Sequence, residues 1–257
     1  MIPDVLVLGC GFTGQAVARL ARERGSRVLV TVRSEAHAAG LRADGLDVLV
    51  TPVVPSLATY AGVQTHVVVC FPPDGTTDAL VAPALGATGA SIAYVSTTGV
   101  YADGAVDDAT PVVASARNAP RLDAESAWRA AGATVLRCPG IYGADRGLHM
   151  RVRRGEHRLP GDGSRFTSRI HVDDLAAHLL AARAVRGETF VVGDLEPAAQ
   201  AEVCRWVCAH FEVPFPLSVP LEEVHETLRS DRRVDGARAR ERLSVTLRYP
   251  SYRDGMA

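Results

Sequence analysis

The sequence contains no lysine, and all 28 of its basic residues are arginine. This absence excludes a lysine Schiff base, the lysine of a phosphate-binding loop and a Tyr-x-x-x-Lys catalytic pair. Arginine keeps its proton at neutral pH, so it cannot replace lysine where a proton must be transferred. Any cationic side chain that holds a phosphate or a ribose in this protein must therefore be an arginine.

Other common signals are also missing. The five cysteines and eight histidines show neither the spacing of a disulfide framework nor that of a zinc site, so we expect reduced thiols and no metal. A net charge of −1 gives no reason to expect a nucleic-acid or membrane partner. No apolar run reaches the roughly 18 residues of a membrane-spanning helix, and the N-terminus leads directly into an expected strand. We therefore expect a cytoplasmic protein.

The stretch DVLVLGCGFTG at residues 4–14 is the strongest positive signal. Residues 5–8 are an unbroken apolar run typical of a buried parallel strand, and residues 15–24 have helical periodicity. Strand, G-x-G-x-x-G and helix in this order form the dinucleotide-binding fingerprint, although a purely structural glycine turn is the alternative. The predicted cofactor contacts here are Gly9, Gly11, Phe12, Thr13 and Gly14.

Arg33 determines which dinucleotide we expect. It stands 19 residues after Gly14, at the tip of a second expected strand over residues 27–31, and no Asp or Glu competes for this position before Glu35. An acidic residue there would hold the ribose 2′-hydroxyl of NAD, whereas an arginine accommodates the 2′-phosphate of NADP. We therefore predict NADP, with NAD less favoured; the alternative is a solvated loop arginine.

Strands and helices alternate along the rest of the chain. This alternation predicts an α/β fold with a Rossmann-like, doubly wound parallel sheet. We expect a single domain over 1–257, with a core of about 1–138 plus 172–193 and a small substrate lobe from 139–171 and 194–257. The expected further strands are 46–50, 65–71, 91–96, 133–137 and 188–192, and the expected helices are 35–43, 76–85, 119–131, 172–185, 200–211 and 221–228.

Four further motifs follow in order. They are YVSTTGVY at 94–101, LRCPGIYG at 136–143, IHVDDLA at 170–176 and YPSYRDG at 249–255. Together with the glycine turn, they resemble the extended short-chain dehydrogenases/reductases of the NAD-dependent epimerase/dehydratase family, and more narrowly a compact atypical, YeeZ-like branch. The resemblance implies an NAD(P)-binding oxidoreductase or epimerase acting on a small molecule that the sequence does not name.

The resemblance also implies a catalytic set from which this chain departs. The family uses a Ser/Thr, which falls on Thr97, and a Tyr-x-x-x-Lys pair, which falls on Arg117 and Arg121. Arg121 could hold the nicotinamide ribose, but neither arginine could act as the tyrosine acid does. Tyr101 is the tyrosine we favour as a substitute, so the catalytic candidates are Thr97, Tyr101 and Arg121.

Weaker catalytic candidates also occur. Tyr142 and Tyr249 each have an arginine four residues later, and His149 and His171 could titrate near neutral pH. We expect both tyrosines to anchor loops and His171 to anchor the 170–174 turn. The basic run at 151–158 is either a solvated face or a wall for an anionic substrate.

The remaining predicted cofactor contacts come from two segments. FPP at 71–73 cannot be helical and should form a rigid wall over the cofactor, and the 136–143 motif supplies further predicted contacts. These contacts are Phe71, Pro72, Pro139, Ile141 and Tyr142, together with Arg121.

Two classes of function remain open. The first is an NADP-dependent oxidoreductase or epimerase with a rearranged proton donor. The second is a non-catalytic NADP(H)-binding sensor or interaction protein, which the missing Tyr and Lys favour; a scaffold without nucleotide is disfavoured by the glycine turn and Arg33. The alanine-rich stretch at 122–131 is compatible with a monomer or a homodimer.

Overall fold

A computed structural model describes residues 2–257, and its centre is a seven-stranded sheet in which every strand pair is parallel. The strand order is β12-β7-β5-β4-β1-β2-β3, so the chain reverses its direction of travel across the sheet between β1 and β4. Ligands of open α/β sheets bind at this switch point, outside the carboxyl ends of the strands. The strands are β1 (Val5–Leu8), β2 (Val28–Val32), β3 (Asp47–Val50), β4 (His66–Val69), β5 (Ser91–Thr97), β7 (Thr134–Cys138) and β12 (Thr189–Val191).

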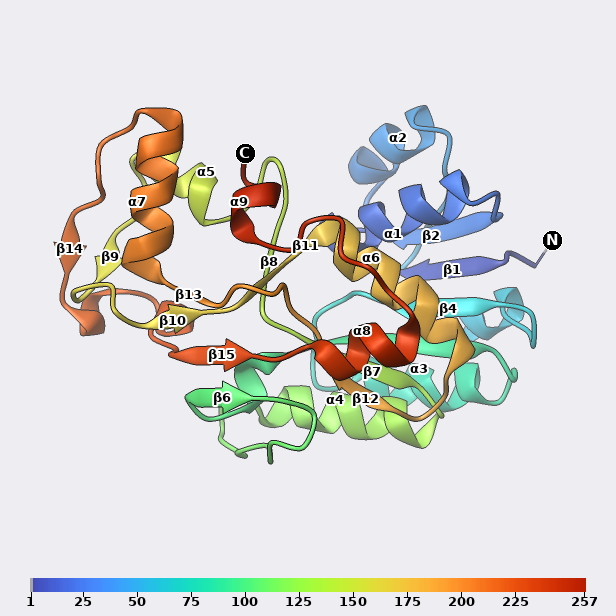
Figure 1. The fold of residues 1–257 in the computed structure, drawn as a ribbon. Coiled ribbons are helices and arrows are strands. Elements are labelled where there is room, and N and C mark those ends of the chain that lie inside the picture. Colours follow the sequence, from blue (N-terminus) through green and yellow to red (C-terminus); the bar gives the residue numbers. More distant parts are fainter. Residues whose placement is uncertain (1) are drawn as a thin grey trace.

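Helices cover both faces of this sheet, which explains why its central strands are apolar throughout. Val5 and Val7 of β1 face one hydrophobic core, while Leu6 and Leu8 face the other. One face carries α1 (Phe12–Glu23), α2 (Glu35–Ala43), α6 (Val172–Ala181) and α8 (Ala237–Leu243), and the other carries α3 (Thr77–Gly86), α4 (Ala119–Ala130) and the 3₁₀ helix η1 (Pro55–Tyr60) (Figure 1). The predicted fold class is confirmed.

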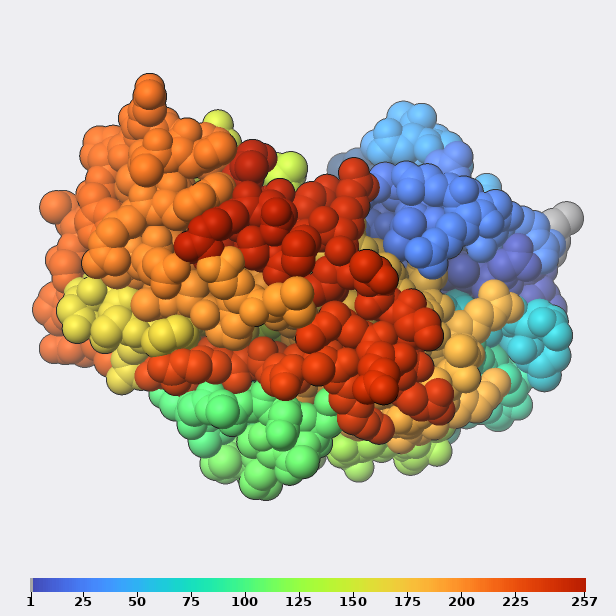
Figure 2. Space-filling model, viewed as in Figure 1, coloured from blue at the N-terminus to red at the C-terminus, as the bar shows by residue number. Residues whose placement is uncertain are grey.

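The second half of the chain builds a smaller lobe at one end of the sheet (Figure 1). Its core includes Tyr142, Val203, Val207 and Tyr252. In the space-filling view, the lobe and the N-terminal helices form two masses with a hollow between them (Figure 2). The lobe contains the helices α5 (Leu148–Arg153), α7 (Gln200–Phe211) and α9 (Tyr252–Gly255).

Short strand pairs lie outside the central sheet. The pairs are β8 (Gly140–Tyr142) with β11 (Arg169–His171), β6 (Gly104–Val106) with β15 (Arg232–Val234), β9 (Leu159–Pro160) with β14 (Ser218–Val219), and β10 (Phe166–Thr167) with β13 (Ala198–Ala199). The first two pairs bring the 136–143 and 170–176 motifs together and place the segment after Tyr101 beside residues 232–234.

Some expected elements differ from those observed. The helix expected over 172–185 ends at Ala181 and continues as the 3₁₀ turn η3 (Ala182–Ala184). The helix expected over 221–228 is instead two 3₁₀ turns, η4 (Leu221–Glu223) and η5 (Glu226–Leu228), with Val224 extended between them. The extended residue breaks the helical hydrogen-bond ladder, so that prediction was wrong.

Candidate functional site

The glycine turn after β1 has the geometry that a bound pyrophosphate requires. Gly9 has φ of +87°, which favours glycine, and a Cβ on Gly14 would lie 2.5 Å from the carbonyl oxygen of Gly9. By contrast, a Cβ on Gly11 would meet no atom within 4 Å. Gly9 and Gly14 are therefore required by the turn itself, whereas Gly11 is exposed and leaves open space in front of the backbone.

The N-terminus of α1 points into the same space. Phe12 begins the helix, Gly11 provides no side-chain cap, and no acidic residue lies in the first turn that includes Thr13. The first N–H groups of such a helix carry partial positive charge and suit an anion. The residues of the turn therefore fit the pyrophosphate of a dinucleotide.

Arg33 directly follows β2 and is exposed. The end of β2 is tied to the glycine turn, because Gly9 N donates to Thr31 Oγ1 at 3.0 Å and Cys10 N donates to Thr31 O at 2.9 Å. Among residues 2–257, no carboxylate forms an ion pair with Arg33. Its guanidinium is therefore not committed to an acid within the described chain.

A small cavity of about 220 Å³ lies over the ends of β4, β5 and β7. Phe71 closes it next to the glycine turn, since a Cβ on Gly9 would lie 3.0 Å from Phe71 N. Burial raises the pKa of the Cys70 thiol in this cavity well above its ordinary value, and it raises the pKa of Cys138 to about 12, so both thiols stay protonated at neutral pH. The cavity brings together six predicted residues: Phe71, Pro72, Thr97, Arg121, Pro139 and Ile141.

Arg121 projects from α4 into the small cavity. Its Nη1 donates to Tyr94 Oη at 2.9 Å and to Val95 O at 3.2 Å, which holds the guanidinium at the edge of β5. Tyr94 in turn stacks on Trp128 of the same helix, with ring centroids 6.0 Å apart. The arginine is thus held in one orientation by the sheet and by its own helix.

Thr97, the last residue of β5, lies where the small cavity meets a larger one of about 720 Å³. Its Oγ1 accepts a hydrogen bond from Gly99 N at 3.0 Å. Pro139 and Ile141 also line both cavities. A group bound in the small cavity would therefore adjoin a group bound in the large one.

Tyr101 is not among the residues that line either cavity. It is 3% exposed, and its hydroxyl accepts a hydrogen bond from Arg137 Nη1 at 2.8 Å. Arg137 also forms a two-pronged ion pair with the fully buried Glu125, which accepts a further bond from Ser96. The sequence predicted Tyr101 as the substitute catalytic tyrosine. Because its hydroxyl is held inside this network, the structure does not place it in either cavity.

The weaker tyrosine and histidine candidates lie on the lobe side. Tyr142 lines the large cavity but is 2% exposed, and its hydroxyl donates to Ser251 O at 3.3 Å. His171 packs edge-on to Tyr142 and beside Tyr249, and its Nδ1 accepts from Asp173 N at 3.2 Å. Burial lowers the pKa of His149, which is not a lining residue of either cavity. These contacts are those of anchoring side chains.

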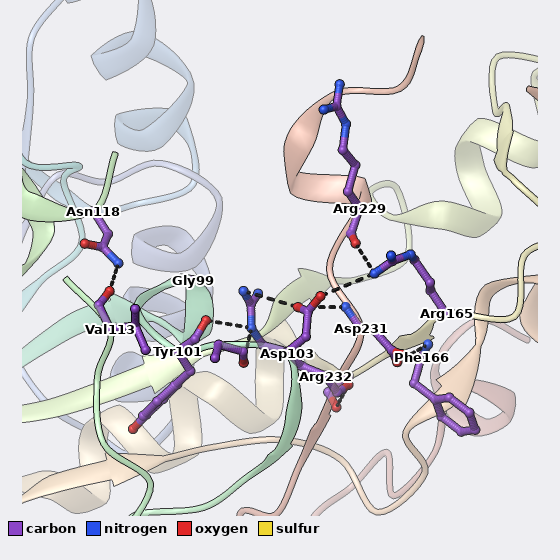
Figure 3. Close-up of polar contacts among 12 residues, drawn as sticks. Gly99, Tyr101, Asp103, Val113, Asn118, Arg165, Phe166, Arg229, Asp231 and Arg232 are labelled. Carbon is purple, nitrogen blue, oxygen red and sulfur yellow. Dashed lines mark hydrogen bonds and ion pairs between the residues drawn. The ribbon is translucent and has the colours of Figure 1, made fainter. Parts of the chain in front are cut away.

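One wall of the large cavity is fixed by Asp103 (Figure 3). Its carboxylate lies 3.3 Å from Arg165 Nη1 and 3.6 Å from Arg232 Nη2, and it accepts a bond from Asp231 N at 3.0 Å. Arg165 also donates to Arg229 O at 2.9 Å. Nearby, Arg117, at the position of the family tyrosine, pairs with Glu226 at 2.7 Å. No sequence pattern indicated Asp103, Arg165 or Arg232, because their contacts join segments more than 60 residues apart.

Within residues 2–257, no three His, Cys, Asp or Glu side chains gather in a way that could hold a metal ion. None of the helices in this range is long and apolar enough to span a lipid bilayer.

Comparison with solved structures places the chain in a family. A functionally unknown conserved protein from Silicibacter pomeroyi DSS is 30% identical, with a TM-score of 0.85, and the match covers 98% of this chain and 95% of that one. The chain belongs to the same family as this protein. No family model matches the chain, and no curated protein matches it.

More distant structures share the epimerase/dehydratase fold. A UDP-glucuronic acid 4-epimerase from Bacillus cereus in complex with NAD is 14% identical, with a TM-score of 0.80, and the match covers 98% of this chain and 95% of that one. A UDP-glucose 4-epimerase from Thermotoga maritima with UDP-glucose is 18% identical, with a TM-score of 0.80 and the same coverage. The chain therefore has the fold of the NAD-dependent epimerase/dehydratase proteins, while membership of the YeeZ-like branch stays a prediction.

Proposed function

We propose that this protein is an NADP(H)-binding oxidoreductase or epimerase that acts on a small molecule held in the large cavity. The observation that carries the proposal is the junction of the two cavities at Thr97, Pro139 and Ile141. A nicotinamide in the small cavity would there adjoin a substrate in the large one. The bound cofactor would supply or accept a hydride, and the protein would supply position and charge.

Three parts of the cofactor have a matching group in this chain. The open space at Gly11 and the uncapped start of α1 suit the pyrophosphate. The exposed Arg33 suits a ribose 2′-phosphate, as NADP but not NAD carries. Arg121, held at the edge of β5, suits the nicotinamide ribose, and the Thr97 hydroxyl can orient a substrate oxygen.

A non-catalytic NADP(H)-binding role is the second candidate. It is favoured by the hydroxyl of Tyr101, which is bonded to Arg137, and by that of Tyr142, which is bonded to Ser251. Arg117 and Arg121 cannot donate protons at neutral pH in their place. Loss of a general acid typically costs about 10²–10⁴-fold in rate. Turnover of NADPH with any small carbonyl compound, abolished in Thr97→Ala, would exclude this candidate.

Titration with NADPH and NADH tests the cofactor assignment. We expect NADPH to bind at least about tenfold more tightly, because one charged contact to the 2′-phosphate is worth about 1.5–3 kcal/mol. Arg33→Ala should remove this preference, whereas Arg24→Ala, an exposed arginine just after α1, should retain it. Equal binding of both nucleotides by the wild type would overturn the NADP assignment, and binding of neither would overturn the proposed function.

A further inference from the structure

Arg169 is a buried cation without an ionic partner. It lines the large cavity from β11, is 5% exposed, and has no carboxylate within 4.0 Å among residues 2–257. Its Nη2 donates to Thr167 Oγ1 at 2.5 Å, while its Nη1 has no hydrogen-bond partner within the described chain. A buried charge without a partner costs several kcal/mol. A bound anion that pairs with the Arg169 guanidinium would offset this cost.

Asp194 does not take this role. It is the carboxylate that acts most strongly on Arg169, yet it lies outside ion-pair distance. Its own Oδ2 has no hydrogen-bond partner among residues 2–257, and burial raises its pKa to about 7. At neutral pH, Asp194 is therefore only a partial counter-charge.

Further arginines line the same cavity, and two of them lie on or just before α5. Arg151 projects from α5, and Arg146 lies in the turn before that helix, with its guanidinium 4.8 Å from the centre of the Phe12 ring. Neither forms an ion pair with a carboxylate of residues 2–257. Arg229, another lining residue, donates only to the backbone oxygens of Val224 and Glu222. With Arg169, the cavity therefore has four arginines that no carboxylate of residues 2–257 neutralises.

The acidic lining residues cannot balance these cations, because both are already paired. Asp103 contacts Arg165 and Arg232, and Glu226 contacts Arg117. The net positive charge of the cavity therefore remains after all internal ion pairs are formed. This arrangement favours a ligand that brings negative charge of its own.

The cavity also indicates what the ligand lacks. Proteins commonly hold an unstacked nucleotide base on an aromatic ring or on a free guanidinium plane. Tyr142, the aromatic residue among those that line the cavity, is 2% exposed. The guanidiniums of Arg146 and Arg169 already lie against aromatic rings, 4.8 Å from the centre of Phe12 and 5.2 Å from that of Tyr252. Gln200 instead offers a hydroxyl-binding group: it is 1% exposed, its Nε2 donates to Leu228 O at 2.9 Å, and its Oε1 has no partner among residues 2–257.

From these observations we infer that the substrate is a small hydroxylated anion without a nucleoside, and that Arg169, Arg151 and Arg146 bind its phosphate or carboxylate group. The inference rests on the proposed function, because it names the substrate class for the same site. It separates this protein from the epimerase of similar fold that was solved with UDP-glucose.

Calorimetric titration of the full-length protein, saturated with NADPH, tests the inference. The probes are inorganic phosphate, malonate, ribose 5-phosphate and UMP. We expect ribose 5-phosphate to bind more tightly than phosphate, and UMP to bind no more tightly than ribose 5-phosphate. The affinities of phosphate and malonate show whether the site prefers a phosphate or a carboxylate group.

Matched variants locate the binding site. Arg151→Gln should weaken ribose 5-phosphate binding about tenfold or more, as expected for the loss of one charged hydrogen bond. Arg154→Gln, an exposed arginine three residues later that does not line the cavity, should leave it unchanged. Arg169→Met should abolish the binding without lowering Tm in the absence of anion, because replacing an unpaired buried charge by an apolar side chain is often neutral or stabilising.

Three results would overturn the inference. They are UMP binding at least tenfold tighter than ribose 5-phosphate, affinities for ribose 5-phosphate that are equal in the wild type and Arg151→Gln, and no binding of any probe at millimolar concentration. Repeating the titration without NADPH separates a failure of this inference from a failure of the proposed function. If the protein binds no dinucleotide but still shows an Arg151-dependent anion site, only the proposed function is contradicted.

Discussion

The hydroxyl of Tyr101 lies 2.8 Å from Nη1 of Arg137, which donates a hydrogen bond to it in the interior of the protein. The Arg137 guanidinium lies 5.1 Å from the centre of the same ring. Burial raises the pKa of Tyr101, and the guanidinium contact opposes that rise. The tyrosine of the YVSTTGVY motif therefore joins the segment after β5 to β7, and it lines neither cavity.

Tyr101→Phe should consequently reduce stability and leave cofactor affinity unchanged. Removing the hydroxyl deprives a buried Arg137 N–H of its acceptor, which costs about 1–3 kcal/mol in unfolding free energy. Urea unfolding and NADPH titration measure the two effects. The control is Tyr60→Phe, since the Tyr60 hydroxyl has no hydrogen-bond partner among residues 2–257. Loss of NADPH-dependent turnover at unchanged stability would instead assign Tyr101 a catalytic role.

Glu125 should be the most sensitive position on α4. Its carboxylate is fully buried and contacts Arg137 through both oxygens, so Glu125→Ala leaves an unpaired buried guanidinium. We expect a loss of about 3–5 kcal/mol in unfolding free energy. Asp123→Ala, an exposed acidic residue on the same helix, should change it by less than about 0.5 kcal/mol. Similar losses in both variants, measured by chemical denaturation, would refute the assignment.

The local parts of this fold could be predicted from sequence, because they depend on neighbouring residues. The helices Glu35–Ala43 and Gln200–Phe211 and the strand Val5–Leu8 have the predicted bounds. Their signals are an N-cap at Ser34 and continuous apolar or helical patterns. The short helix α9 was missed, although the Ser251–Asp254 capping box that begins it is a local signal.

The large cavity could not be predicted in the same way. Its walls come from segments that meet only after folding, such as Asp103 with Arg232 and Gln200 with Leu228. The orientation of the Tyr101 side chain likewise depends on its hydrogen bond to Arg137 and on the ion pair of Arg137 with Glu125. Arg137 lies on β7 and Glu125 on α4, and no local sequence pattern indicates that they meet Tyr101. Sequence patterns thus predicted the glycine turn, while the large cavity depends on tertiary contacts.

Asp194 should make the protein less stable as the pH rises. Burial raises its pKa in the folded state to about 7, whereas its ordinary value is 3.8. Between these values the folded state holds the proton more tightly than the unfolded state, so the unfolding free energy falls as pH increases from about 4 to about 7. Asp194→Asn removes this dependence and keeps the Oδ1 acceptor for Glu196 N.

The comparison is made by urea unfolding at several pH values. The stability of Asp194→Asn relative to the wild type should increase across the window and become constant above it. A difference that stays the same from about pH 4 to about pH 8 would show that Asp194 titrates as an ordinary surface carboxyl.

Gly11→Val tests the central claim, that the glycine turn holds a dinucleotide, most directly. Gly11 has φ of −84° and ψ of −155°, so valine can adopt its backbone, and a Cβ there meets no atom within 4 Å. The variant should keep the Tm of the wild type. The control Gly40→Ala on α2, where a Cβ also finds open space, should keep or raise it, because alanine favours a helix over glycine by about 1 kcal/mol. NADPH affinity should fall by about tenfold or more in Gly11→Val alone, because the side chain fills the space that the pyrophosphate needs. Unchanged NADPH affinity in a folded Gly11→Val protein would contradict the account.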